Sequence, residues 1–298
     1  KRQARNTSLL QPPNISFGSS LAGQLDPWAD PSGNAFAPQS PGDSDLGDQL
    51  MLMPQSDYKA FSFRVSEQLL WTSNAALTER NTLDDFYSKT QIGFSYVPQL
   101  IGNTYLEISS DYAWYRYDRN SFLDFDSLNA SAGIIHVFRE LNDLSGWFRY
   151  NHLRLLDGHG RHELFTDHTL EAGLYYPIPI GRKHLAFGSY SSEFSLDGNP
   201  GYSARHEHSV TVGYIFFPTD RLELSLYYDF FVLDYTEIER TDLLQNMGVS
   251  LAFRIREGID LILQGSYSHN DSDFSLFGFD GDYKVGDAGG TIGIQVEF

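Results

Sequence analysis

Cysteine is absent from this sequence of 298 residues. Disulfides, thiolate metal sites and cysteine nucleophiles are therefore excluded. The sequence also lacks any apolar run that approaches the roughly 18 residues needed for a transmembrane helix. Positive charge is scarce, because 21 Lys and Arg residues stand against 39 Asp and Glu residues, for a net charge of −18. With so little basic surface to neutralise phosphates, the chain is not expected to bind nucleic acid.

Aromatic residues are abundant instead, at 15% of the chain, although the mean hydropathy is only −0.34. Residues 1–57 differ from the rest, since they are rich in Pro, Gly, Ser, Asp and Gln and show neither a helical nor a strand period. This composition predicts an irregular extension. Two alternatives stay open for it: a flexible segment, or a segment that orders only when it docks on a partner or plugs a lumen.

From residue 58 onward, apolar and polar residues alternate in one segment after another. In the first of these segments Phe61, Phe63 and Val65 share one face, because side chains two apart in a strand point the same way. About 12 segments of roughly 10–15 residues show this period, and none shows a helical stripe. We therefore assign residues 58–298 to an all-β domain.

The connections between these segments alternate between two kinds. Short turns, such as 217–221 and 254–260, follow longer or more acidic loops, such as 156–163 and 269–290. This alternation is typical of a transmembrane antiparallel up-and-down β-barrel, here with about 12 strands. Lipid offers backbone groups no hydrogen-bond partner, so a spanning sheet must close on itself. The alternative is a soluble all-β protein, such as a propeller or a double sandwich, which has no need of loops that alternate in length.

The last eight residues, TIGIQVEF, continue the alternation to the very end of the chain. We therefore expect the final residue to be hydrogen-bonded into the sheet, where the last strand meets the first. The segment also resembles the C-terminal β-signal of bacterial outer-membrane proteins. Thr291, Gly293, Val296 and Phe298 occupy the four specified positions of that signal.

The resemblance implies an integral protein of a Gram-negative-type outer membrane. It implies insertion by the barrel-assembly machinery and contact with the lipid bilayer and with lipopolysaccharide. By the convention of this class, the longer loops face the outside of the cell. The extension at 1–57 then lies in the periplasm, where a protein partner could bind it.

The polar face of each segment is expected to line a lumen. The candidate lumen and selectivity residues are Arg64, Glu107, Asp111, Arg149, Glu171, Glu223, Asp229 and Arg254. Acids outnumber arginines on this face, which favours cations by charge selection. Small residues between them leave space for an open channel, but inward ion pairs and the extension could equally plug the lumen.

Neighbouring aromatic residues recur along the segments, and we expect them to form girdles at the two membrane interfaces. The pairs are Tyr175/Tyr176, Phe216/Phe217, Tyr227/Tyr228 and Phe230/Phe231, and the single residues expected with them are Trp114, Tyr96 and Phe138.

Catalysis, whether as an outer-membrane phospholipase or as an outer-membrane protease, is not expected, and neither is metal binding. An outer-membrane phospholipase needs Ser, His and Asn together on its outer wall, and the nearest string contains His269, Asn270 and Ser272. A spacing of three places the His and Ser side chains on opposite faces of a strand. Histidines also gather near predicted loop ends, where we interpret them as interface residues and not as a metal site: His159, His162, His168, His206 and His208. No cofactor-binding motif is present.

Two functions remain. The first is a porin-like channel for small ions or solutes that prefers cations. The second is a non-conducting barrel that anchors or completes an envelope or secretion assembly through residues 1–57. The long extension favours the second function, and the small and acidic inner face favours the first.

Overall fold

The computed structural model describes residues 59–298 except 81, 182, 274, 277 and 278, and only the backbone of 275, 276, 279 and 280. The predictions for the extension, including the boundary at residue 57, lie outside the described residues. Among the residues described, no helix is long and apolar enough to cross a membrane.

Long antiparallel strands make up the wall, and each pairs with the next one along the chain. These strands are β1 (Phe61–Thr72), β2 (Asp85–Tyr96), β4 (Thr104–Tyr117), β5 (Phe125–Phe138), β6 (Leu144–Asp157), β7 (Glu163–Pro179), β8 (His184–Asn199), β9 (Arg205–Thr219), β10 (Leu222–Tyr235), β11 (Thr241–Arg256), β12 (Ile259–Ser272) and β15 (Tyr283–Glu297). The connections hold β3 (Gln99–Ile101), β13 (Ser275–Leu276), β14 (Phe279–Asp280) and three single turns of 3₁₀ helix, η2 (Ser121–Leu123), η3 (Arg139–Leu141) and η4 (Gly201–Ser203).

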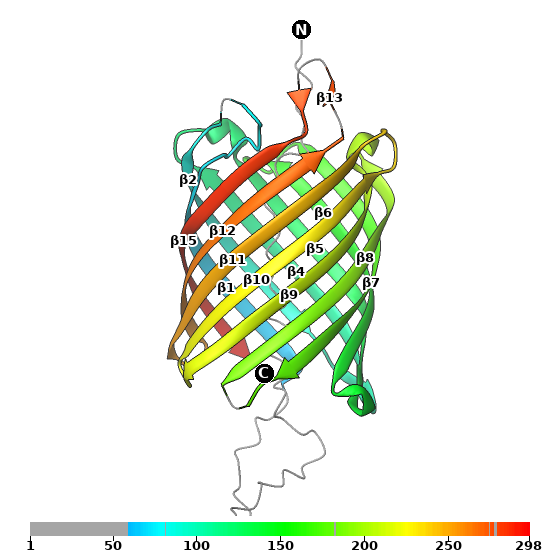
Figure 1. The fold of residues 1–298 in the computed structure, drawn as a ribbon, viewed down its shortest axis with the longest axis vertical. Helices are drawn as coiled ribbons and strands as arrows, with labels where there is room; N and C mark the ends of the chain where they lie inside the picture. Colours follow the sequence, from blue (N-terminus) through cyan, green and yellow to red (C-terminus); the bar gives the residue numbers. More distant parts are fainter. Residues whose placement is uncertain (1–58, 81, 182, 274, 277–278) are drawn as a thin grey trace, which may run out of the picture. The chain divides into compact units, whose positions relative to one another are not determined.

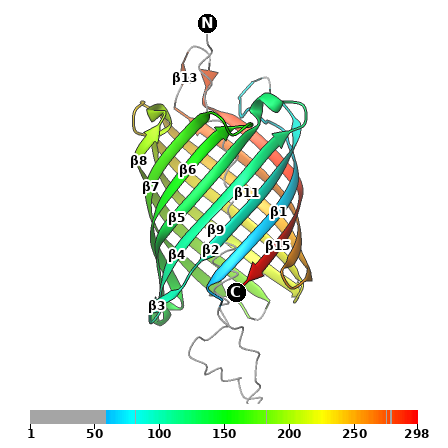
Figure 2. The ribbon, with the colours of Figure 1, turned by 180° about the vertical axis from the view of Figure 1, so that it is seen from behind.

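The sheet closes where β1 pairs with β15, so the wall is a closed 12-stranded barrel of tilted strands (Figures 1 and 2). The last residue takes part in this closure. The backbone N–H of Phe298 donates to the carbonyl of Phe61 at 2.9 Å, and the Phe61 N–H donates back to Phe298 at 3.3 Å. The predicted barrel and the predicted bonding of the final residue are both confirmed.

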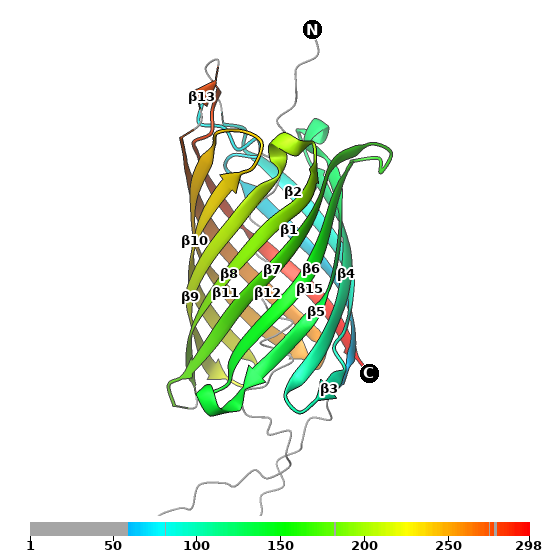
Figure 3. The same ribbon diagram turned by 90° about the vertical axis from the view of Figure 1, so that its right-hand side faces the viewer.

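The two ends of the barrel differ in their connections (Figure 3). At one end, here called the turn end, β1 begins, β15 ends, and the connections include two-residue turns at 220–221 and 257–258. Gly258 has a φ of +74°, and a Cβ there would lie 2.4 Å from the Gln295 carbonyl oxygen, so this turn requires glycine. The other end, here called the loop end, carries the longer connections 73–84, 118–124, 158–162, 200–204, 236–240 and 273–282.

The outer face is apolar along most of the wall. Leu69, Val212 and Leu263 are each at least half exposed, and their neighbours along the strands point inward, as in a wall that faces lipid. Glu67 is an exception midway along β1, where its carboxylate accepts a hydrogen bond from the Thr90 hydroxyl of β2.

The prediction of aromatic girdles from neighbouring aromatic pairs is wrong for half of their members. Tyr176 and Tyr228 are exposed on the outer face, but Tyr227 is buried on the inner face and Tyr175 packs there against Phe187. The reason is the strand period itself, because adjacent residues point to opposite faces.

Candidate functional site: the barrel lumen

The predicted lumen residues lie on the inner face, because each alternates along its strand with apolar residues of the outer wall. The cross-strand register then decides which of them are neighbours. Only part of the set is brought together. Glu107, Arg149 and Glu171 form one cluster, and the others lie apart: Arg64, Asp111, Glu223, Asp229 and Arg254. Of these, Arg254 lies near the turn end, 3.6 Å from Asp260.

Arg149 of β6 stands at the centre of the cluster. Its guanidinium donates from Nε to Glu171 Oε2 at 2.7 Å and from Nη2 to Glu171 Oε1 at 3.0 Å, a bidentate pair. The same carboxylate accepts bonds from Trp147 Nε1 at 2.9 Å and from Asn151 Nδ2 at 3.0 Å. Glu171 is therefore fixed by several donors, and its charge is largely matched by Arg149.

The same arginine also reaches Glu107, which lies two strands away on β4, at 3.5 Å. Gly133 of β5 stands between them in the register, facing both Glu107 and Arg149. A Cβ at Gly133 would lie 2.4 Å from the Arg149 Cβ. The missing side chain on β5 is thus what lets an ion pair span three strands.

These residues belong to a longer line of side chains across the wall. Going from one strand to its hydrogen-bonded neighbour, the line runs Glu107, Gly133, Arg149, Glu171, Glu193 and Glu207, on β4 to β9. We call it the glutamate row. Glu107 is near the turn end of β4, and Glu207 is near the loop end of β9. Because the strands are tilted, the row rises from the turn end toward the loop end as it crosses from β4 to β9.

Sequence reasoning missed the second half of this row. Glu193 accepts a hydrogen bond from the Thr169 hydroxyl, and Glu207 lies 3.5 Å from Arg205 Nη2. The alternation of polar and apolar residues along β8 and β9 is enough to predict that Glu193 and Glu207 point inward. Their place in one row with Glu171 depends on strand register, and β7 and β8 are shifted by an irregularity between His168 and Thr169.

Asp111 and Asp229 are held by neutral groups. Asn129 Nδ2 donates to Asp111 at 2.9 Å, and Asn246 Nδ2 donates to Asp229 at 3.0 Å. Amide donors orient a carboxylate without bringing a positive charge to it.

Large aromatic rings on the inner wall lie against glycines of the next strand. Trp147 covers Gly173, and Phe187 covers Gly213, where an added Cβ would fall 2.1 Å and 2.2 Å from ring atoms. Tyr227 covers Gly248 in the same way, at 2.2 Å. Glycine gives the ring a place on the wall, and the ring shields the glycine backbone. These three rings therefore lie along the wall and do not cross the lumen.

The loop end is built differently. Inner-face positions of β1 to β7 carry an apolar cluster that includes Leu70, Tyr115 and Phe125, and Ala75 of the β1–β2 connection packs into it. Leu77 of the same connection packs into a second cluster with Leu233, Leu244, Tyr283 and Val285, on β10, β11 and β15. The β1–β2 connection thus lies inside the mouth of the barrel.

Polar bonds fix this connection in place. Ser73 donates its N–H to the Gly286 carbonyl at 2.9 Å, and Gly286 N–H donates to the Ser73 hydroxyl at 2.7 Å. Asn74 is almost fully buried, and its Nδ2 donates to the carbonyls of Thr78 and Lys284 at 2.8 and 3.0 Å. The connection is therefore anchored to β15 before it turns into the mouth.

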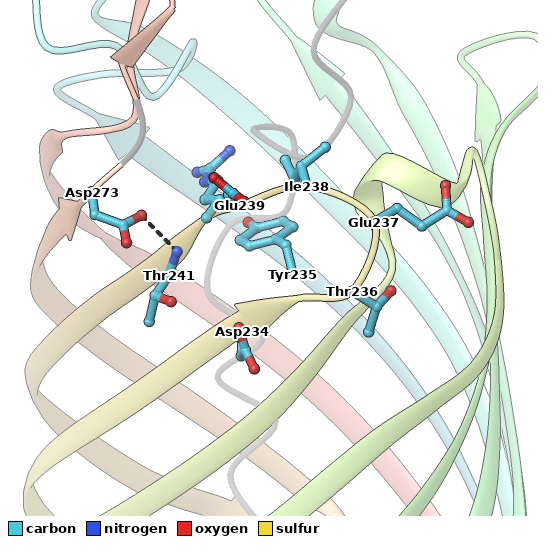
Figure 4. Close-up of a pocket in the computed structure, with 9 residues that line it drawn as sticks. Asp234, Tyr235, Thr236, Glu237, Ile238, Glu239, Thr241 and Asp273 are labelled. Carbon is cyan, nitrogen blue, oxygen red and sulfur yellow. Dashed lines mark hydrogen bonds between the residues drawn. The ribbon is translucent and has the colours of Figure 1, made fainter.

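A shallow pocket lies at the rim of the loop end, on the β10–β11 connection (Figure 4). The Thr241 N–H donates to Asp273 Oδ1 at 2.7 Å, which ties this connection to the start of the last loop. The acids Asp234, Glu237 and Glu239 also line it. The pocket lies at the rim, away from the Glu107–Arg149–Glu171 cluster.

The histidines that the sequence singles out lie outside the lumen. His206 and His208 pack edge-on against the outer Phe194 ring, and the His168 ring lies 4.5 Å from that of His152. His159 and His162 are in the β6–β7 connection. Within the described part of the chain, no group of three or more His, Cys, Asp or Glu residues is placed to hold a metal ion.

The string His269, Asn270 and Ser272 is divided between faces. Asn270 and Ser272 donate to Asp242 on the inner side, at 3.2 and 2.5 Å, whereas His269 faces outward opposite Lys284.

The four positions of the C-terminal signal are also divided between the two faces of the wall. Thr291 and Gly293 are buried on the inner face, and Val296 and Phe298 are exposed on the outer face: this satisfies the spacing of the signal but does not test recognition by the assembly machinery.

Several known structures align with this chain. An outer-membrane channel from Pseudomonas putida F1 aligns with a TM-score of 0.53 at 11% identity, over 81% of this chain and 98% of that one. The translocator domain of the autotransporter NalP from Neisseria meningitidis aligns over 80% and 88% at 12% identity, with a TM-score of 0.44. The KdgM porin in complex with disordered oligogalacturonate aligns over 79% and 99% at 8% identity, with a TM-score of 0.43.

The first of these likenesses shows that the fold is that of a bacterial outer-membrane β-barrel. At such low identity it shows the fold alone. No protein-family model and no curated protein matches the sequence.

Proposed function

We propose that this protein is a porin-like channel of the bacterial outer membrane, which passes small ions or solutes and prefers cations. The glutamate row supports the proposal most strongly. It presents four carboxylates, from Glu107, Glu171, Glu193 and Glu207, against two arginines, Arg149 within the row and Arg205 beside Glu207. A lumen lined by excess negative charge raises the local concentration of cations and lowers that of anions.

The aromatic rings that lie on glycines support passage through the lumen. Three of the large aromatic residues on the inner wall, Trp147, Phe187 and Tyr227, are each seated on a glycine of the next strand. A barrel of about 12 strands is wider than the eight-stranded kind whose side chains fill the interior. This greater width supports a passage for small ions or solutes below the mouth.

The closed barrel and its apolar outer wall support a place in the outer membrane. The TIGIQVEF terminus supports insertion by the barrel-assembly machinery, with lipid and lipopolysaccharide as neighbours. We place the loop end outside the cell, because the termini of the barrel then lie on the periplasmic side. The alternative function, an anchor for an envelope assembly, depends on residues 1–57, which lie outside the described residues, and it stays a prediction.

The test is the reversal potential of single channels in planar bilayers under a KCl gradient. Glu193→Gln and Glu207→Gln remove charge from the row without changing side-chain size, so cation preference should fall in each and fall further in the double variant. Asp220→Asn makes the same chemical change at an exposed turn and is the matched control. An unchanged reversal potential in the double variant would show that the row does not set selectivity.

A further inference from the structure

One outward carboxyl group interrupts the apolar outer wall midway along its strand. Glu67 of β1 lies between Val65 and Leu69 on the outer face, and the Thr90 hydroxyl of β2 donates to its Oε2 at 2.5 Å. Among the described residues, no donor reaches its other oxygen, Oε1. An ionisable group at this depth of a lipid-facing wall is destabilising unless something other than lipid satisfies it.

A hydroxyl group without a partner lies close by on the same face. Ser88 of β2 stands opposite Leu69 in the register, and it points outward because the buried Tyr87 beside it points inward. No described residue forms a hydrogen bond with the Ser88 hydroxyl. The face therefore carries both a spare acceptor, on Glu67, and a spare donor, on Ser88.

The shape of this face is self-complementary. Leu69 is 66% exposed, and its neighbours across both strand pairs are small, Gly290 on β15 and Ser88 on β2. Ala288 on β15 and Gly265 on β12 face each other in the next outward row. A Cβ at Gly290 or Gly265 would lie no nearer than 3.4 Å to an atom of a neighbouring strand, so the packing of the barrel itself does not require glycine there. A protruding leucine beside such low positions lets two copies of one face interlock.

The outer face of β9 to β11 is different. Its outward residues midway along the strands are large and apolar, as Val212, Met247 and Val249 are. Where this wall carries an outward polar pair, the two groups satisfy each other, because the Tyr228 hydroxyl donates to Gln245 Oε1 at 2.9 Å. This part of the wall therefore suits lipid, whereas the face around Glu67 suits protein.

The size of the face around Glu67 fits a second copy of this chain. It covers four neighbouring strands, β12, β15, β1 and β2. With strands about 4.8 Å apart and an apolar band about 25 Å tall, each copy contributes roughly 500 Å². The pair then buries roughly 1,000 Å², which reaches the range of specific interfaces. In an isologous pair the same surface is used twice, so the spare acceptor of each copy meets the spare donor of the other.

We propose that the outer face of β12, β15, β1 and β2 joins two copies of this chain in the membrane, about a twofold axis along the membrane normal. Glu67 of each copy accepts a hydrogen bond from the partner's Ser88, and Leu69 packs over the partner's small residues. The pairing goes beyond the channel function and does not depend on it.

The first test uses the absence of cysteine from the chain. Leu69→Cys places the only thiol at the centre of the proposed interface, and Val212→Cys places it on β9 as the control. In lipid vesicles at a low ratio of protein to lipid, an oxidant should link Leu69→Cys into a disulfide-bonded dimer and leave Val212→Cys monomeric. Equal dimer formation in the two variants, or none in either, would overturn the proposal.

The second test measures what Glu67 contributes, by counting subunits in lipid bilayers through stepwise photobleaching of the labelled full-length chain. Glu67→Leu removes both symmetric hydrogen bonds and should raise the dimer dissociation constant about tenfold or more, equivalent to about 1.4 kcal/mol. Gln245→Leu removes an outward polar group from the other wall and should dimerise as the wild type does.

A wild type that counts as a monomer or a trimer would contradict the pairing, as would an unchanged dissociation constant in Glu67→Leu. If Glu67→Leu does not fold, the comparison of Leu69→Cys with Val212→Cys decides alone. Since neither test measures current, a monomer that conducts contradicts only this inference, and a dimer that is silent contradicts only the channel.

Discussion

The mouth at the loop end and the wall below it fill the same kind of inward position with different residues. At the mouth, β1, β2, β4 and β5 turn Leu70, Tyr87, Tyr115 and Phe125 inward, and the β1–β2 connection packs on them. Below it, inward positions carry aromatic rings seated on glycine or the charges of the glutamate row, which reaches the level of the mouth at Glu207. Strand alternation therefore decides which residues face the lumen, whereas residue size and strand register decide whether these residues obstruct it.

The largest expected effect is at the mouth. Leu77→Asp places a charge in an apolar cluster, where an unpaired carboxylate costs at least several kcal/mol, so the β1–β2 connection should leave the mouth. Single-channel conductance should then rise, on the order of twofold or more, if this connection limits the flow. Leu83→Asp changes an exposed residue of the same connection and should leave conductance unchanged. Equal conductance in the wild type, Leu77→Asp and Leu83→Asp would show that the mouth is not the narrowest point of the lumen.

The next effect concerns stability of the charged wall. Gly133→Ala puts a Cβ 2.4 Å from both the Arg149 Cβ and the Phe148 carbonyl oxygen, so β5 and β6 must shift. Overpacking of this kind typically costs about 1–3 kcal/mol. The urea midpoint of the barrel in lipid vesicles should fall accordingly. Gly188→Ala has 3.9 Å to its nearest neighbour and serves as the control. A urea midpoint equal to that of Gly188→Ala would contradict the close approach of Arg149 to Gly133, on which the ion pair from Arg149 to Glu107 depends.

A smaller effect is expected from the flat rings. In Gly213→Val the larger side chain displaces the Phe187 ring, because even a Cβ would lie 2.2 Å from it. The ring must turn toward the lumen, so conductance should decrease while ion preference stays the same. Adding Phe187→Ala to this variant should restore the conductance, and failure to restore it would argue against displacement of the ring as the cause.

The smallest effect is a shift in selectivity. Arg149→Gln removes the cation that partly neutralises Glu171 and Glu107. Cation preference should increase modestly, because the carboxylates then face the lumen without it. The reversal potential under a KCl gradient measures the change, and a shift toward anions would contradict the assigned role of this arginine.

Much of the barrel could be predicted from the sequence. Alternation places Arg149 and Glu171 on the inner face, and the TIGIQVEF run places Phe298 in the closing pair, because the strand period depends only on local geometry. The contact between Arg149 and Glu107 could not be predicted, since it needs the register of β4, β5 and β6 and the missing side chain of Gly133.

The mouth could not be predicted either. The connection at 73–84 reads as a polar loop, yet Leu77, which has a φ of +48°, packs against strands on the far side of β15. Aromatic pairs mislead for a related reason. Tyr227 and Tyr228 are adjacent in sequence, but the alternation that defines the barrel sends them to opposite faces.

We propose that the charged inner wall makes this barrel a cation-preferring channel. The most direct measurement is the reversal potential of the purified wild-type protein in a planar bilayer under a KCl gradient. We expect stable conductance steps whose reversal potential has the sign set by potassium. Steps with the sign set by chloride, or a bilayer that stays silent after insertion is verified, would contradict it.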